Sequence, residues 1–98
     1  MRTLVTVTVP AATGSRAIKD GSMGKIIGTF QEKWKPEASY FYTVGGDRTA
    51  MFVVDIKEAS QMPSMFEPLF AQLDARIDLK PVLNTTDLQS GLAALAKA

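Results

Sequence analysis

Asp55 is the carboxylate of this sequence whose neighbours best suit it to act as a general base, because it stands among the apolar residues of the run 50–56. A carboxylate that faces a cavity is desolvated, so its pKa rises and it can accept a proton near neutral pH. If the strand ends one residue early, Asp55 is instead an ordinary exposed strand end. We therefore hypothesise that Asp55 is a catalytic base and that the phenol of Tyr42 is an acid or hydrogen-bond donor.

Three aromatic side chains provide candidates for a substrate pocket. Trp34, Tyr40 and Tyr42 lie close together in the sequence and could surround an apolar or aromatic metabolite. The alternative is that these rings pack at a subunit interface, where aromatic side chains bury a large area.

Three charged or polar residues are candidates for binding an anionic substrate. Lys19 and Asp20 stand where a helix is expected to break, and the free N–H groups of the next helix can receive an anion there. Arg48 follows a Gly-Gly-Asp turn and could reach the same kind of ligand. The alternatives are a solvated helix cap and a surface pair between Arg48 and Asp47, which contributes at most about 1 kcal/mol.

Several classes of chemistry are excluded by composition. The chain has no histidine and no cysteine, which removes disulfides, thiolate nucleophiles, the usual zinc sites and histidine-dependent triads. The net charge is +1, from 11 basic and 10 acidic residues that are interspersed along the chain. Proteins that bind nucleic acid through phosphate contacts show clustered Lys and Arg, so we expect no nucleic-acid partner.

The N-terminal region argues for a cytoplasmic protein without a membrane partner. Residues 3–9 have the alternation of a strand, with three valines on one face and Leu4 and two threonines on the other, instead of the unbroken apolar block of a signal peptide. No run reaches the roughly 18 apolar residues that a membrane-spanning helix needs.

The hydrophobic pattern predicts four strands and the helices between them. Alternation predicts strands at 3–9 and 75–83, and a Gly-Gly turn joins two β-rich runs, 38–44 and 50–56, into a hairpin. Helical spacing covers 11–34, with a break at which Gly21 forms a left-handed cap and Ser22 caps the second helix. A helix is expected over 60–73, beginning at Ser60 or at a Ser64–Glu67 capping box, and a short amphipathic helix starts at Thr85 or Thr86.

The order β-α-β-β-α-β with a terminal helix predicts one α+β domain over residues 1–98. It corresponds to the ferredoxin-like arrangement, in which helices cover one face of a four-stranded antiparallel sheet. Both faces of the hairpin strands are apolar here, since Phe52 and Val54 oppose Met51 and Val53. A sheet face in contact with water should be polar, so we expect a second copy of the chain to cover it. The RNA-recognition module shares this strand order but needs aromatic residues at set positions of its first and third strands, where this chain has only Phe52.

The layout resembles the dimeric α+β barrel superfamily, which includes small monooxygenases of antibiotic biosynthesis, muconolactone isomerases and many small bacterial proteins. The likeness is carried by residues 18–22 (IKDGS), 35–38 (KPEA), 67–70 (EPLF) and 81–84 (PVLN). It implies two sheets packed face to face in a homodimer and a ligand cleft between sheet and helices in each subunit. Haem-degrading members commonly use a histidine ligand, which this chain lacks, so we expect no cofactor.

Two functional hypotheses follow. The chain is either a homodimer that binds an apolar or aromatic small molecule, as a cofactor-free oxygenase or isomerase would, or a non-catalytic dimeric interaction or regulatory protein. A cavity of roughly 300 Å³ or more with convergent polar groups favours the first hypothesis, and a filled interface between helices and sheet favours the second.

Overall fold

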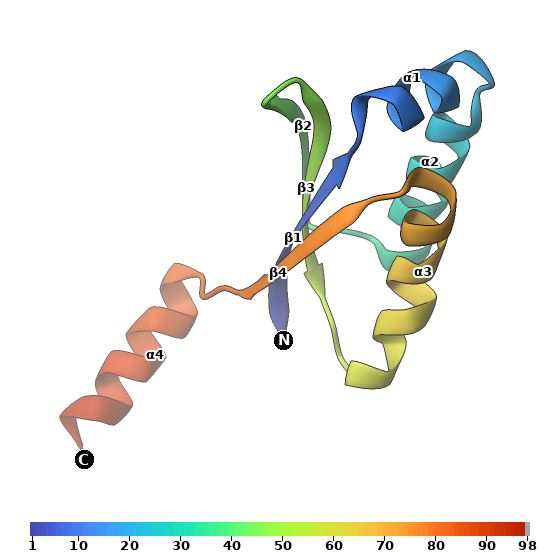
Figure 1. Ribbon diagram of the computed structural model, residues 1–98. Coiled ribbons are helices and arrows are strands. Elements are labelled where there is room, and N and C mark those ends of the chain that lie inside the picture. The colour runs from blue at the N-terminus through green and yellow to red at the C-terminus, as the bar shows by residue number, and fades with distance from the viewer. Residues whose placement is uncertain (98) are drawn as a thin grey trace.

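Four antiparallel strands form the centre of the computed structural model, which describes residues 1–97 of the chain (Figure 1). The strands lie in the order β2-β3-β1-β4. Their bounds are β1 Arg2–Val9, β2 Ala38–Val44, β3 Asp47–Asp55 and β4 Arg76–Pro81. The predicted α+β class with a four-stranded antiparallel sheet is confirmed.

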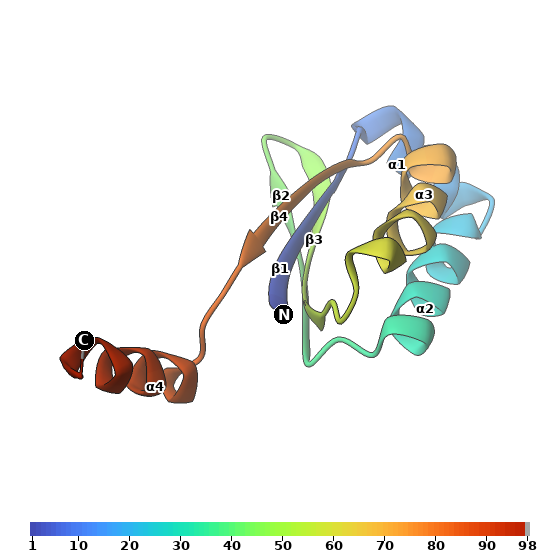
Figure 2. The same ribbon diagram turned by 90° about the horizontal axis from the view of Figure 1, so that it is seen from below.

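Three helices cover one face of the sheet, and the other face is open (Figures 1 and 2). The covering helices are α1 Ala11–Lys19, α2 Ser22–Trp34 and α3 Met62–Leu73, the last preceded by the short 3₁₀ helix η1 Ala59–Gln61. Helix α4, Thr85–Ala96, extends away from the sheet and from the other helices. Among residues 1–97, none of the helices combines the length and the apolar character needed to cross a lipid bilayer.

The core lies between the covered sheet face and the helices, as the alternation of β1 predicts. Val5, Val7 and Val9 are buried, whereas the intervening residues are only partly buried. Val5 pairs with Phe52 of β3, which is 0% exposed. The Phe52 ring lies 4.7 Å from that of Phe30, measured between centroids, so a strand and helix α2 meet at this residue.

The helix break at Gly21 is confirmed, although its capping differs from the expectation. Gly21 has φ +79°, the left-handed conformation that glycine adopts without a Cβ penalty. Gly21 itself occupies the N-cap of α2, and Ser22 is the first helical residue and makes no capping hydrogen bond with its side chain. Helix α2 ends at Trp34, just before Lys35 and Pro36, as predicted.

The hairpin is tighter than the sequence pattern indicated. Gly45 and Gly46 have φ +58° and +86°, and Val44 pairs directly with Asp47 across them. Two positive φ values in succession allow a two-residue turn whose twist matches that of the strands. Strand β3 therefore begins at Asp47, three residues before the predicted start.

The expected capping box at Ser64 is wrong. Glu58 and Gln61 form the capping box instead, and α3 begins at Met62 with a proline in its first turn. The alternative start near Ser60 was the closer one, and Pro68 consequently lies inside the helix. A proline there removes one backbone hydrogen bond, which the burial of the apolar side of α3 offsets.

Replacing Gly28 with alanine should raise the free energy of unfolding by about 0.5–1 kcal/mol, because glycine is a poor residue for a helix interior. Gly28 is exposed in the middle of α2, and an added Cβ would meet no atom within 4 Å. Urea denaturation measures the change. Gly21→Ala is the matched control and should lower stability, because φ at Gly21 is positive. A loss of stability in Gly28→Ala would contradict the open space seen at this position.

Candidate functional site

A largely apolar cleft of about 510 Å³ lies between the β2–β3 hairpin and helices α1 and α2. Its volume is within the range of clefts that hold small ligands, roughly 300–1,000 Å³. Its apolar lining comes from three strands and both helices and includes Val7, Val9, Ile18, Met23, Ile27 and Phe41.

The cleft exists because small residues meet large ones at this end of the core. Val7, Val9 and Ala50 are buried strand residues that line it, and none fills the space as Phe52 does further along the sheet. Ile18 and Phe41 also line the cleft and are more than half exposed. Apolar side chains therefore remain in contact with water here, and a bound apolar molecule would remove them from it.

Within the described part of the chain, Arg48 is the only charged residue that lines the cleft. Strand pairing places Arg48 opposite Val9, the last residue of β1. Only Pro10 separates Val9 from the start of α1. The Nη1 atom of Arg48 lies 3.4 Å from Oγ of Ser15, and no carboxylate of residues 1–97 forms an ion pair with it. The guanidinium is thus available to bind an anion.

The alternative pairing of Arg48 with Asp47 is not formed. The Asp47 carboxylate accepts a hydrogen bond from the backbone N–H of Ala11 at 3.0 Å and lies 3.7 Å from the guanidinium of Arg76. The Asp47 carboxylate is thus bound by the start of α1 and by β4, and it does not pair with Arg48.

Gly14 provides room for the guanidinium, and the sequence analysis did not single it out. A Cβ atom at Gly14 would lie 2.9 Å from Nη1 of Arg48, closer than real Cβ contacts. The absence of a side chain on this buried turn of α1 therefore lets the guanidinium lie against the helix. The only signal in the sequence was a glycine inside a helix, a position that usually has a packing or functional reason.

The three predicted aromatic residues do not form one pocket. Tyr42 lines the cleft, but Tyr40 is exposed on β2 and does not, and Trp34 lies at the end of α2. Phe41 is the aromatic wall of the cleft instead, with its ring edge toward Phe52 at a centroid distance of 6.0 Å. Alternation along β2 places Phe41 on the helix-covered face and both tyrosines on the open face, so Tyr42 only borders the cleft and does not share its wall with Phe41.

Asp55 lies outside the cleft, and its pKa shifts in the direction opposite to the expected one. It is the exposed last residue of β3, and its Oδ1 accepts a hydrogen bond from the N-terminal amine of Met1 at 3.0 Å. That hydrogen bond lowers the pKa of Asp55, and the positive charge of the amine and those of Lys57 and Arg2 act in the same direction. The exposed strand end was the better interpretation of this residue, and its catalytic role stays a prediction, since Asp55 does not line the cleft.

Lys19 and Asp20 form the solvated helix cap that was the alternative to an anion site. Oδ1 of Asp20 accepts a hydrogen bond from the backbone N–H of Ser22 at 2.9 Å. Hydrogen bonding from Ser22, through its side chain and its backbone, lowers the pKa of Asp20. The chain's own carboxylate therefore occupies the helix start, and Lys19 is exposed next to it.

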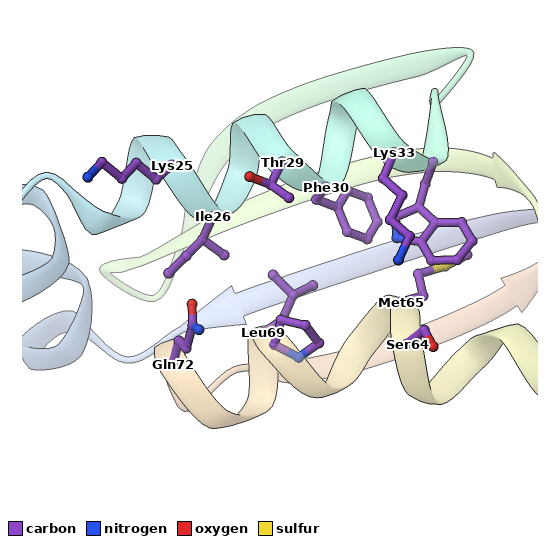
Figure 3. Close-up of a pocket in the computed structure, with 11 residues that line it drawn as sticks. Lys25, Ile26, Thr29, Phe30, Lys33, Ser64, Met65, Leu69 and Gln72 are labelled. Atoms are coloured by element: carbon purple, nitrogen blue, oxygen red, sulfur yellow. The ribbon is translucent and has the colours of Figure 1, made fainter.

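A second, smaller groove of about 300 Å³ runs between α2 and α3 and contains Trp34 (Figure 3). Its floor is formed by core side chains that point toward each other from the two helices, including Phe30, Met65 and Leu69. Lys25 and Lys33 stand on its rim, and Nζ of Lys33 lies 5.1 Å from the centre of the Trp34 ring. The cleft beside the β2–β3 hairpin, called the hairpin cleft below, is the better candidate for a ligand site. It is larger than the groove and contains the guanidinium of Arg48, which forms no ion pair within residues 1–97.

The described residues offer no obvious metal site, since within 1–97 no three acidic side chains are grouped as metal ligands would be. The chemistry available in the cleft is that of an apolar wall and a guanidinium, with Tyr42 at its border on the open-face side of β2. Comparison of the chain with protein-family models and with curated proteins finds no match to either.

Proposed function

We propose that the chain binds a small apolar or aromatic molecule with one anionic group in the hairpin cleft. The observation that carries the proposal is the cleft itself, which is apolar except for Arg48 and a few neutral polar groups. We further propose that the chain is ferredoxin-like and works as a homodimer of the dimeric α+β barrel type, with its open sheet face against that of a second copy.

The chemistry of the cleft indicates how such a ligand would lie. Its apolar part would contact Val7, Val9 and Ile27, where burial of apolar surface contributes about 25 cal/mol per Å². Its carboxylate, sulfonate or phosphate would meet the guanidinium of Arg48, which can donate two parallel hydrogen bonds to an anion. A ligand with an anionic group at the mouth of the cleft and an apolar body inside it would therefore contact both Arg48 and the apolar lining.

If the chain is an enzyme, cofactor-free oxygenase or isomerase chemistry would rely on Tyr42. Among residues 1–97, it is the only titratable side chain besides Arg48 that borders the cleft. Arginine stays protonated in proteins, so Arg48 binds charge but does not exchange protons. Tyr42 belongs to the open-face side of β2, so its phenol would have to turn toward the bound molecule to act as an acid or a hydrogen-bond donor.

A non-catalytic dimeric interaction protein is the second candidate, and the open sheet face favours it. Leu4, Met51 and Val53 lie side by side on this face and are only partly buried. Tyr40 and Val44 of β2 continue the apolar surface and are exposed. A face of this kind marks an interaction site whether or not the cleft binds a ligand.

The ligand hypothesis predicts that 2-naphthoate binds and that Arg48→Gln weakens binding. Removing a charge-assisted hydrogen bond costs about 1.5–3 kcal/mol, so the dissociation constant should rise roughly tenfold to a hundredfold. Isothermal titration calorimetry of the wild type and the variant measures the change. The neutral 2-naphthamide should bind both proteins equally and more weakly than the wild type binds naphthoate.

Arg16→Gln is the matched control, since Arg16 is an exposed arginine of α1 that does not line the cleft. It should leave naphthoate binding unchanged. Equal binding of naphthoate and naphthamide by the wild type, or equal losses in the two arginine variants, would argue against Arg48 as the anion-binding group. Absence of binding by both compounds would leave the interaction protein as the better proposal.

A further inference from the structure

Helix α4 has an apolar stripe that nothing in its own subunit covers. Leu88, Leu92 and Leu95 follow one another at spacings of four and three, which places them on one side of the helix. They are 50%, 55% and 70% exposed, and Leu83 in the preceding linker is exposed as well. Every residue from 83 to 97 is exposed.

The direction of α4 is set by contacts at its first turn. Asn84 and Asp87 form a capping box, in which the Asn84 side chain accepts from the Asp87 N–H. Asp87 also forms an ion pair with Arg2 at 2.8 Å, and the N–H of Val82 donates to the Arg2 carbonyl. These contacts hold the start of α4 beside the beginning of β1, from where the helix points away from the sheet (Figures 1 and 2).

The chain is more extended, and exposes more surface, than a compact protein of its mass. Its radius of gyration is 15.8 Å, whereas a compact domain of about 100 residues has roughly 13 Å. Its accessible surface is 6430 Å² for 10.6 kDa, and a compact monomer of that mass exposes roughly 5,500 Å². The excess, roughly 900 Å², is close to the 800 Å² or so that each partner buries in a stable interface.

We infer that α4 is an arm that packs on a second copy of this chain, against the edge strand β2. Tyr40 and Val44, on the open-face side of that strand, are 63% and 54% exposed. Residues 38–44 contain no charged side chain, and the arm from 82 to 97 contains only Asp87 and Lys97. Two uncharged surfaces with exposed apolar side chains thus fit each other, and the arm would cover a sheet edge that is otherwise open to association.

On the arm's own subunit, the apolar open-face residues Leu4, Met51 and Val53 are those that we propose the sheet of the second copy covers, and the strand nearest the root of the arm is charged. The strand that leads into the arm is β4, whose open-face side chains are Arg76, Asp78 and Lys80. The exposed apolar residues of β2 lie at the opposite edge of the sheet, three strand spacings or about 14 Å away. A return of α4 to that edge would require the Arg2–Asp87 ion pair to break. A second copy presents the same strand without this cost, and two-fold symmetry would bury both arms at once.

The inference rests on the proposed homodimer and not on the ligand. Sedimentation velocity of the full-length chain at a series of micromolar concentrations gives the dimer dissociation constant. Leu92→Glu, which places a charge on the stripe, should raise that constant about tenfold or more. Ser90→Glu is the matched control on the opposite side of α4 and should leave it unchanged. Circular dichroism would verify that both variants are folded, as expected for exposed positions.

A second measurement uses the absence of cysteine from the chain. Leu92→Cys and Val44→Cys, mixed in equal amounts and oxidised, should form a mixed disulfide between two chains, whereas Ser90→Cys mixed with Val44→Cys should form little. A disulfide within one chain of the Leu92/Val44 double cysteine variant would show that α4 packs on its own subunit and would overturn the inference.

The possible results test separately whether α4 packs on a second copy and whether the chain forms a homodimer. A wild-type dimer that Leu92→Glu does not weaken would overturn the arm but leave the sheet-face homodimer in place. A wild type that stays monomeric would overturn both and would indicate that a different protein or a lipid surface covers α4. Neither result would alter the naphthoate test of the cleft.

Discussion

Replacing Phe52 with alanine should lower the free energy of unfolding by about 3–5 kcal/mol, the loss typical of a large buried aromatic side chain. Phe52 is completely buried and is the residue at which β3, β2 and α2 meet. Its ring packs against those of Phe30 and Phe41 at centroid distances of 4.7 and 6.0 Å, so truncation opens a cavity beside two aromatic rings. A loss of this size is a large part of the stability of a small domain.

Urea denaturation at one fixed protein concentration measures this change, because dimer formation would make stability depend on concentration. Phe70→Ala is the matched control, since Phe70 is a phenylalanine of α3 that is 42% exposed. It should cost less than about 1 kcal/mol, as is usual for surface substitutions. Similar losses in the two variants would contradict the central position of Phe52.

Replacing Val53 with aspartate should raise the dimer dissociation constant about a hundredfold, or roughly 3 kcal/mol, because a carboxylate without a partner is strongly disfavoured at an apolar interface. Val53 lies opposite Leu4 and beside Met51 on the open sheet face, at the centre of the surface that we propose to be buried between two copies. Light scattering over a dilution series reports the change.

Thr29→Asp provides the control for Val53→Asp, because it adds the same charge at an exposed position of α2, on the helix-covered side of the sheet and away from the open face. It should leave association unchanged. If Val53→Asp stays as dimeric as the wild type while both variants are folded, the sheet face is not the interface. Together with Leu92→Glu, this variant tests separately the two surfaces of the proposed dimer.

Local features of the chain could be read from the sequence because they depend on neighbouring residues. The alternation of Val5, Val7 and Val9 predicts a strand with one buried face, since successive strand side chains point to opposite sides. Gly21 and the Gly45–Gly46 turn could be read because glycine is the residue that most readily adopts positive φ. The start of α3 was misread because Ser64–Glu67 and Glu58–Gln61 both resemble caps, and only packing selects between them.

The candidate site was only partly predictable, and the reason is geometric. Arg48 and Tyr42 were singled out and both line the cleft, but Ser15 and Gly14 of α1 were not connected with them. Ser15 and Arg48 are 33 positions apart and meet because strand pairing places Arg48 opposite Val9, just before α1 begins. The residue pattern of β1, of β3 or of α1 taken alone does not show that Arg48 pairs with Val9.

The sequence by itself thus determined the types and order of the elements, the two apolar faces of the hairpin strands and the exclusion of histidine and cysteine chemistry. These properties follow from residue types and local spacing, which set backbone conformation and the side of an element that is apolar. Only the tertiary structure decided that Tyr42 borders the cleft whereas Trp34 lies in the groove between α2 and α3, and that the pKa of Asp55 is lowered and not raised. It also decided that α4 is exposed to solvent and does not pack on its own subunit. Those outcomes depend on strand register and on which surfaces meet across the fold, and neither is written in any local stretch of the chain.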